Sequence, residues 1–327
     1  MLNPELKLNP KIFDEDVEQK PIRDGYGDAL VELGEKNPNV VVLTADLAES
    51  TRVHKFAEKF PERFIECGVA EQNMAGIAAG LGVSGKIAFI SSYATFSPGK
   101  NWETIRTTIV YNDANVKIAG HHAGIVTGPD GPTHQATEDI AITRCWPNIK
   151  IISPCDYWEA KKATLYSAEV YGPFYLRFVR DQSPIITTRE TPFNFGKIEK
   201  FWFSEKPEIV IFATGHLVYQ ALLAAKDLEK EIQLMVCNVH TIKPLDEKTL
   251  IEIANLSSLK GIITVEDHQI KGGLGSAIAE FLVQTKPLKM KFIGLTTFAE
   301  SGKPQDLLKK YKLDKEAIKQ AIFELIF

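Results

Sequence analysis

Short runs of apolar residues alternate with longer amphipathic segments along most of the chain. Between residues 21 and 185, such runs predict strands at 40–43, 87–91, 116–120, 149–153 and 174–178, and Phe64 and Ile65 suit a further short strand. Amphipathic segments after Ala70 and over 102–111 predict helices between them. Because strands that alternate with helices usually pair in parallel, this part predicts a mainly parallel sheet with helices on both faces.

The same alternation returns further along the chain. Apolar runs at 209–212, 233–237, 261–265 and 291–294 predict strands, and segments at 218–228, 248–254, 274–284 and 316–327 predict helices. Residues 186–206 are expected to be a linker, and the polar residues 1–20 an arm that packs on a neighbour or stays mobile. The predicted fold class is α/β with two domains, 21–185 and 207–327, each a mainly parallel sheet flanked by helices.

Size and composition narrow the classes of function. At 327 residues the chain exceeds the usual single core, which agrees with two domains. A net charge of −4 without a Lys/Arg tract argues against nucleic acid as a partner. No apolar run approaches the ~20 residues that span a membrane, and no secretory signal is visible. The 4 cysteines form no C-x-x-C pair, which is typical of reduced thiols in a cytoplasmic protein rather than of a zinc site.

One carboxylate stands out in the segment 67–76. Glu71 lies where the short apolar strand gives way to a helix of small residues. An acid at such a helix start can be shielded by apolar neighbours, where its hydrogen bonds strengthen. The simpler interpretation is an acid in the first helical turn that interacts favourably with the helix dipole.

Aromatic and histidine residues gather just beyond two further predicted strands. Tyr93 and Phe96 follow the strand at 87–91, and the loop 121–135 after the next strand holds His121, His122, Asp130 and His134. In open α/β sheets, ligands bind beyond the carboxyl ends of the strands. This grouping therefore predicts a site at one edge of the first sheet.

The ordered set of motifs resembles the C-terminal half of transketolases. It consists of Asp46-Leu47, 68–74, 93–96, His122, 130–135 and 147–149, and the resemblance covers about residues 20–325. It implies a domain that binds the aminopyrimidine of thiamine diphosphate, followed by a smaller C-terminal domain. The Gly-Asp-Gly…Asn signature by which the family's other half holds the diphosphate through Mg²⁺ is not found.

The chain thus resembles one subunit of a split transketolase. The resemblance implies transfer of a two-carbon ketol (glycolaldehyde) unit from a ketose phosphate to an aldose phosphate, as in the pentose phosphate pathway. The cofactor would be thiamine diphosphate, with the Mg²⁺ ligands on a diphosphate-binding N-terminal subunit. Because such sites lie between two kinds of domain from different protomers, an α2β2 heterotetramer is expected.

The resemblance also assigns roles to cofactor-binding residues. Glu71 matches the catalytic acid that is hydrogen-bonded to ring nitrogen N1′ of the cofactor. Phe96 would stack on the pyrimidine, and Tyr93 would line the same pocket, unless both rings are only core packing. Asp46 matches a position beside the cofactor at the subunit interface, although a helix N-cap is an equal alternative.

Substrate-binding roles follow in the same way. Arg23, Ser50, His122 and Arg180 match the family's phosphate ligands, and two guanidinium groups suit bidentate bonds to phosphate. Asp130 matches a residue that binds a hydroxyl next to the reacting carbon. His134 matches a catalytic histidine close to that carbon, suited to moving protons near neutral pH. Two ambiguities are left open: Arg177 competes with Arg180, and His121 with His122.

Three other interpretations share parts of this pattern. A 1-deoxyxylulose 5-phosphate synthase, or the beta subunit of a 2-oxo-acid dehydrogenase, would have the same acid and the same fold. The loop that runs from His122 through 130–134 favours transketolase over both. A non-catalytic scaffold subunit is a third alternative, but a scaffold has no physical need for an intact Glu71 and histidine set.

Overall fold

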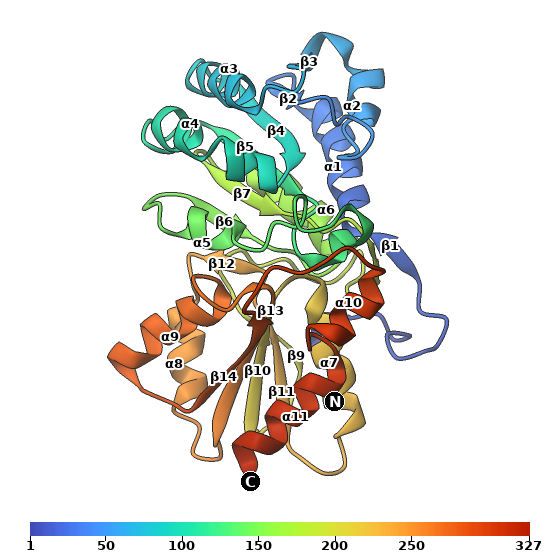
Figure 1. Ribbon diagram of the computed structural model, residues 1–327, viewed down its shortest axis with the longest axis vertical. Coiled ribbons are helices and arrows are strands. Elements are labelled where there is room, and N and C mark those ends of the chain that lie inside the picture. Colours follow the sequence, from blue (N-terminus) through green and yellow to red (C-terminus); the bar gives the residue numbers. More distant parts are fainter.

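The computed structural model describes all residues, 1–327, as two α/β units that lie one above the other along the long axis (Figure 1). The first sheet has seven strands in the order β12-β6-β7-β5-β4-β2-β3. Its strands are β2 (Val40–Thr44), β3 (Phe64–Glu66), β4 (Ile87–Tyr93), β5 (Val116–His121), β6 (Lys150–Ile152), β7 (Phe174–Arg177) and β12 (Thr241–Lys243). All of the pairs among β2 to β7 are parallel, as the sequence predicts.

Helices cover both faces of this sheet. They are α1 (Ile22–Lys36), α2 (His54–Lys59), α3 (Glu71–Val83), α4 (Trp102–Thr104), α5 (Asp139–Arg144) and α6 (Tyr157–Glu169). Shorter turns are the 3-10 helices η2 (Pro61–Arg63) and η5 (Ile125–Asp130) and the π-helices η3 (Thr95–Lys100) and η4 (Ile105–Val110). Alternate residues of β2 enter two different cores: Val41 and Leu43 pack on one face, Val40 and Val42 on the other. Burial on both faces explains why these strands read as continuous apolar runs.

The second sheet has five strands in the order β14-β13-β10-β11-β9. Its strands are β9 (Glu199–Trp202), β10 (Ile209–Ala213), β11 (Leu234–Asn238), β13 (Gly261–Gln269) and β14 (Met290–Leu295). The helices of this unit are η6 (Gly215–Leu217), α7 (Val218–Asp227), α8 (Glu247–Ala254), α9 (Leu274–Thr285), α10 (Pro304–Lys310) and α11 (Lys315–Ile326). The predicted α/β fold of two mainly parallel sheets is confirmed. None of the helices is both long and apolar enough to span a bilayer.

The pattern of apolar residues does not predict four short strands of the structure. The segment expected to be a plain linker contains β9, which pairs antiparallel with β11 at the edge of the second sheet. The strand β12 leaves the second unit and pairs antiparallel with β6 of the first sheet. Two further short strands, β1 (Gln19–Pro21) and β8 (Gln182–Pro184), form an antiparallel ribbon. Strands of three or four residues are too short to show a clear periodicity.

The N-terminal segment, which includes the 3-10 helix η1 (Pro4–Leu6), packs on its own chain. It lies against the second unit of its own chain, where the backbone N–H of Asn3 donates to the carbonyl of Phe201 at 2.9 Å. Leu6, Leu8 and Ile12 are buried in the same core as residues of β10 and α7. Figure 1 accordingly places the N-terminus beside α7 and α11. Three apolar residues in a polar segment thus anchor to its own chain a segment that the sequence predicts as an arm on a neighbour or a mobile end.

A buried ion pair ties the two units together. Arg177 Nε lies 2.8 Å from Asp139 Oδ2, and Arg177 Nη2 lies 3.2 Å from Asp139 Oδ1. The same Nη2 donates to the carbonyl of Asp267, on β13, at 2.8 Å. Tyr175 donates its hydroxyl to Asp139 Oδ2 at 2.6 Å. Both charged side chains are almost fully buried, at 2% and 1% exposure, so removal of one partner would leave the other charge unpaired inside the protein.

We therefore expect Asp139→Asn to lower the free energy of unfolding by about 3–5 kcal/mol, measured by urea denaturation. The control is Glu316→Gln, which removes an exposed partner of Lys319 and should change stability by less than about 1 kcal/mol. A loss for Asp139→Asn no larger than that of the control would contradict a structural role for the buried pair.

Candidate active site

The predicted site residues converge at the carboxyl edge of the first sheet. They follow five strands that are adjacent in the order β7-β5-β4-β2-β3. Asp46 comes after β2, Glu71 after β3, Tyr93 and Phe96 at the end of β4, His122, Asp130 and His134 after β5, and Arg180 after β7. Arg23 lies in the first turn of α1, and Ser50 lies in the loop that follows β2. Parallel pairing brings these side chains to one edge although they are spread over residues 23–180.

Glu71 is the first residue of α3, and its side chain is buried. The turn before it begins at Gly68, whose φ of +66° is a backbone conformation that favours glycine. The only side-chain donor to the carboxylate is Lys100, whose Nζ lies 2.9 Å from Oε2. Asn101 Nδ2 donates to the backbone carbonyl of Glu71 at 3.0 Å. The carboxylate is thus held at a fixed point beside the turn η3.

The sequence interpretation missed a second acid. Glu66, at the end of β3, accepts hydrogen bonds on Oε1 from the backbone N–H groups of Asp46 at 2.7 Å and Gly68 at 2.9 Å. It therefore holds the loop after β2 against the turn that precedes Glu71. Its signal in the sequence is an acid at the end of a strand just before a glycine turn. Asp46 itself is exposed with a φ of +60°, and it does not precede a helix, so the alternative of a helix N-cap is wrong.

Four rings form a cluster next to this turn. Tyr93 stacks on His122 with ring centroids 3.8 Å apart, and its ring is nearly parallel to that of Phe96 at 6.0 Å. His134 meets Phe96 edge-on at 5.4 Å and Tyr93 at 5.9 Å. Phe96, Tyr93 and His134 are all partly exposed, so the cluster is not closed core packing. Such rings offer a flat apolar surface to a heterocycle.

Two guanidinium groups lie on the other side of His122. Arg23 Nη1 donates to the backbone carbonyl of Ser50 at 2.8 Å, so Ser50 positions this arginine through its main chain. Arg180 Nη1 donates to the carbonyl of Thr127 at 3.2 Å and lies 3.9 Å from Asp130 Oδ1. Both arginines are close enough to His122 to affect its charge. The result is a basic corner that suits an anion.

The structure separates the members of both ambiguous pairs. Arg177 is fully engaged in the buried ion pair with Asp139, whereas Arg180 is half-exposed in the basic corner. His121 is buried between Tyr26 and Phe178, with ring centroids 5.1 Å from each. His122 is equally buried, but its ring stacks on Tyr93 of the aromatic cluster, and Arg23 and Arg180 are close enough to lower its pKa. The geometry thus favours Arg180 and His122 as the residues that face the site.

The second unit contacts residues 121–135, the histidine-rich loop that follows β5. Asp267 Oδ1 accepts from the backbone N–H of Ile125 at 3.0 Å, and Asp267 Oδ2 lies 3.0 Å from His216 Nε2. Gln135 Nε2 donates to the carbonyl of Glu300 at 3.1 Å. At Gly124 a Cβ atom would lie 2.1 Å from the Asp267 carboxylate, so only glycine fits. The second domain thus holds in place the loop that carries His122, Asp130 and His134.

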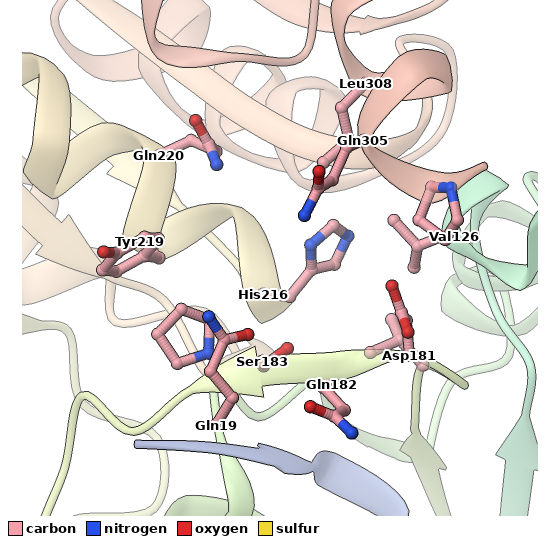
Figure 2. Close-up of a pocket in the computed structure, with 13 residues that line it drawn as sticks. Gln19, Val126, Asp181, Gln182, Ser183, His216, Tyr219, Gln220, Gln305 and Leu308 are labelled. Atoms are coloured by element: carbon pink, nitrogen blue, oxygen red, sulfur yellow. The ribbon is translucent and has the colours of Figure 1, made fainter. Parts of the chain in front are cut away.

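A separate cavity lies between the two units, lined by Val126 of the loop and by His216 of η6 among others (Figure 2). Its volume is about 270 Å³, and Figure 2 shows His216 near its centre, with Gln19, Gln220 and Gln305 around it. None of the predicted site residues lines it, so this cavity is not the candidate active site. The structure also holds no group of three or more His, Cys, Asp or Glu side chains arranged to bind a metal ion.

The fold and the site together define a two-domain α/β subunit of the kind that forms the C-terminal half of a transketolase. Family models agree: the transketolase pyrimidine-binding domain matches residues 18–184, and the transketolase C-terminal domain matches residues 202–318. The chain belongs to the transketolase family.

Individual relatives show which part of a transketolase it represents. A putative transketolase C-terminal section from Methanocaldococcus jannaschii is 45% identical, over 93% of this chain and 96% of that protein. A 6-deoxy-6-sulfo-D-fructose transketolase subunit from a Clostridium species is 34% identical, over 96% and 97%. The solved structure of a split-gene transketolase, described as an inactive β4 tetramer, superposes with a TM-score of 0.86 at 40% identity, over 93% and 98% of the two chains. The chain spans about half the length of two longer relatives: 48% of transketolase-like protein 2 from Mus musculus and 49% of transketolase from Homo sapiens. It corresponds to the C-terminal section of transketolases.

His122 gives a prediction on pH. Burial, reinforced by the Arg23 and Arg180 guanidinium groups, by His134 and by Arg52, lowers the pKa of His122 from 6.5 to about 2. Between these values the unfolded chain binds more protons than the folded chain. The free energy of unfolding therefore keeps the full contribution of the neutral ring above pH ~6.5 and loses it as the pH falls. The loss amounts to ~1.4 kcal/mol between pH ~7.5 and pH ~5.5. We expect wild type to lose that much more stability in urea denaturation than His122→Asn does; equal losses would contradict a neutral His122.

Proposed function

We propose that this chain is the C-terminal subunit of a split transketolase. With a diphosphate-binding partner subunit, it would transfer a two-carbon ketol unit from a ketose phosphate to an aldose phosphate. The observation that carries the proposal is the buried Glu71 at the start of α3, beside a turn that bears Phe96, within a chain of this family. A carboxylate and an aromatic ring at one place are the two features that an aminopyrimidine needs.

The residues at this edge fit the pyrimidine of thiamine diphosphate. Glu71 can hydrogen-bond a ring nitrogen, and the exposed faces of Phe96 and Tyr93 can pack on a flat heterocycle. Thr95 Oγ1 and Asn101 Oδ1, on the same turn, are buried without a hydrogen-bond partner in the protein. Buried polar atoms usually have a partner, so these two oxygens mark places where a ligand can donate. When bound, the cofactor supplies a carbon nucleophile and an electron sink, and Mg²⁺ would be held by the partner subunit.

Side chains of the protein then orient the cofactor ring and exchange protons with the substrate. Glu71 holds a proton at the ring nitrogen N1′, and Phe96 fixes the plane of the ring. His134 lies 2.9 Å from Thr133 Oγ1 through Nδ1, which leaves Nε2 to exchange a proton with a substrate hydroxyl. Asp130 accepts from a neighbouring hydroxyl of the sugar.

The basic corner binds the distal phosphate of the sugar. Arg23 and Arg180 supply charge and directed N–H groups, and Arg23 Nε is buried without a partner in the protein. His122 contributes as a neutral donor, because its pKa is lowered to about 2. Ser50 holds Arg23 in place through its carbonyl and can add its hydroxyl to the phosphate. This set favours a phosphorylated sugar over the 2-oxo acid that the dehydrogenase alternative requires.

A partner subunit is expected to cover the surface around Glu71. Val69, two residues before Glu71, is 71% exposed. Gly76 and Gly80 of α3 are exposed, and nothing lies within 4 Å of a Cβ placed on either, so no intrachain contact requires glycine there. Glycine weakens a helix by about 1 kcal/mol relative to alanine, so close approach of another chain would explain both positions. Two copies of each subunit, in an α2β2 heterotetramer, are consistent with the closed symmetry that most oligomers have.

The main test is activity after mixing. We expect ketol transfer from xylulose 5-phosphate to an aldose phosphate when this chain is combined with a diphosphate-binding subunit, thiamine diphosphate and Mg²⁺. Glu71→Gln should fold normally and lose most turnover at ordinary cofactor levels, because the amide cannot share a proton with N1′ in the same way. Turnover is followed with a coupled assay for the aldose or ketose product.

The matched control is Glu62→Gln, a change of the same chemistry at an exposed acid of η2, which should leave turnover unchanged. Decarboxylation of a 2-oxo acid without ketol transfer would favour the dehydrogenase or synthase alternatives. No turnover of either kind by the assembled wild-type complex would favour the scaffold.

A further prediction concerns the isolated chain. Because the surface around Val69 and α3 would lack its partner, we expect the chain alone to self-associate or to have low stability. Analytical ultracentrifugation over a concentration series checks this, with the assembled complex as reference. A compact, stable monomer at all concentrations would contradict the expectation.

A further inference from the structure

The ion pair between Glu71 and Lys100 has no part in the roles described so far. Lys100 Nζ lies 2.9 Å from Glu71 Oε2, and the two side chains differ sharply in exposure. The carboxylate is 3% exposed, whereas the lysine is 52% exposed. A nearly buried acid therefore has one solvent-accessible cation as its only charged partner.

The local backbone fixes where this lysine stands. Lys100 is the last residue of η3, the same short turn that carries Phe96. The next residue, Asn101, is fully buried and donates to the carbonyl of Glu71 at 3.0 Å and to Ser97 Oγ at 3.2 Å. These bonds tie the end of η3 to the start of α3. A heterocycle that packs on Phe96 and reaches the Glu71 carboxylate must therefore approach the lysine ammonium.

The lysine and a protonated ring nitrogen compete for one carboxylate. Both are hydrogen-bond donors that gain from its negative charge. A cation that stayed at Oε2 would draw charge away from the oxygen that has to share a proton with N1′. Lysine can leave at small cost, since its ammonium is strongly hydrated and sits on a flexible four-carbon stem. A buried carboxylate left alone, by contrast, is unfavourable, and some partner must be present at each stage.

We propose that Lys100 is a displaceable counter-ion of Glu71. It holds the carboxylate charged and in position, and it gives way to the pyrimidine ring nitrogen when the cofactor binds. Lys100 is in this sense a positioning residue that acts through Glu71. The inference rests on the proposed function, because it needs a pyrimidine ligand at Glu71.

The test measures cofactor binding rather than turnover. The assembled two-subunit enzyme is titrated with thiamine diphosphate in the presence of Mg²⁺ by isothermal calorimetry, in two buffers of different ionisation enthalpy. Lys100→Met keeps the length of the side chain and removes its charge, and Lys100→Gln is a second neutral variant if the first folds poorly. We expect the neutral variants to bind the cofactor about five-fold more tightly than wild type, since no ion pair has to be broken.

The same titrations report the protons taken up on binding. Loss of the neighbouring cation favours the protonated form of a buried acid, so the neutral variants should take up fewer protons than wild type. Two further variants complete the set. Lys100→Arg keeps the charge and should bind the cofactor no more tightly than wild type, because a guanidinium is less hydrated and leaves a carboxylate less readily. The control Lys86→Met, at a residue just before β4 whose side chain bonds only Asn39, should match wild type within about two-fold.

Equal or weaker binding by the neutral variants would overturn the inference, because Lys100 would then be a bystander or a direct ligand of the cofactor. Tighter binding with an unchanged proton count would also overturn it, since the lysine would not act through Glu71. Failure of the wild-type complex to bind thiamine diphosphate at all would instead count against the proposed function.

Discussion

The structure depends on the register of five parallel strands. Thr44 pairs with Glu66 on one side and with Ser91 on the other, and Gly120 pairs with Arg177, so β3, β2, β4, β5 and β7 end at nearly the same level. Each chain segment that leaves this edge carries one part of the site. A shift of one residue in any of these strands would move each side chain from one of the two packed cores to the other, so packing enforces the register. The positions of the functional groups are thereby set by the core rather than by the loops.

Loops alone would not hold such groups in place. The second domain holds the loop 121–135 in place, because the Asp267 carboxylate accepts from Ile125 and the carbonyl of Glu300 accepts from Gln135. The buried Arg177, which also bonds the backbone of Asp267, joins this contact to the first sheet. None of the residues proposed to bind cofactor or substrate belongs to the second domain. Its part is to make the histidine-rich loop rigid, which is what precise placement of hydrogen-bond donors requires.

Sequence reasoning succeeded where the physical signal is local. Strands buried on both faces, such as β2 and β10, are unbroken apolar runs, and the motifs beyond their ends are dense in glycine and histidine. The confirmed family follows from those motifs. The sequence was less informative where an element is short or where its partner lies far away in the chain. The strands β9 and β12 have only three or four residues. The apolar residues Leu6, Leu8 and Ile12, which anchor the N-terminal segment, are scattered in a polar stretch. Glu66 was overlooked because a single acid after a strand carries no pattern of its own.

The sequence by itself determined the fold class, the family and the set of residues gathered at one sheet edge, since periodicity and motif order are properties of neighbouring positions. Only the tertiary structure decided between chemically equivalent candidates. Arg177 is buried against Asp139 while Arg180 faces the site, and His121 lies between two core rings while His122 stacks on Tyr93. It also revealed Lys100 as the partner of Glu71, 29 positions away in the chain. Which of two similar side chains meets solvent, and which meets a distant charge, depends on packing across the whole sheet, and no local pattern encodes it.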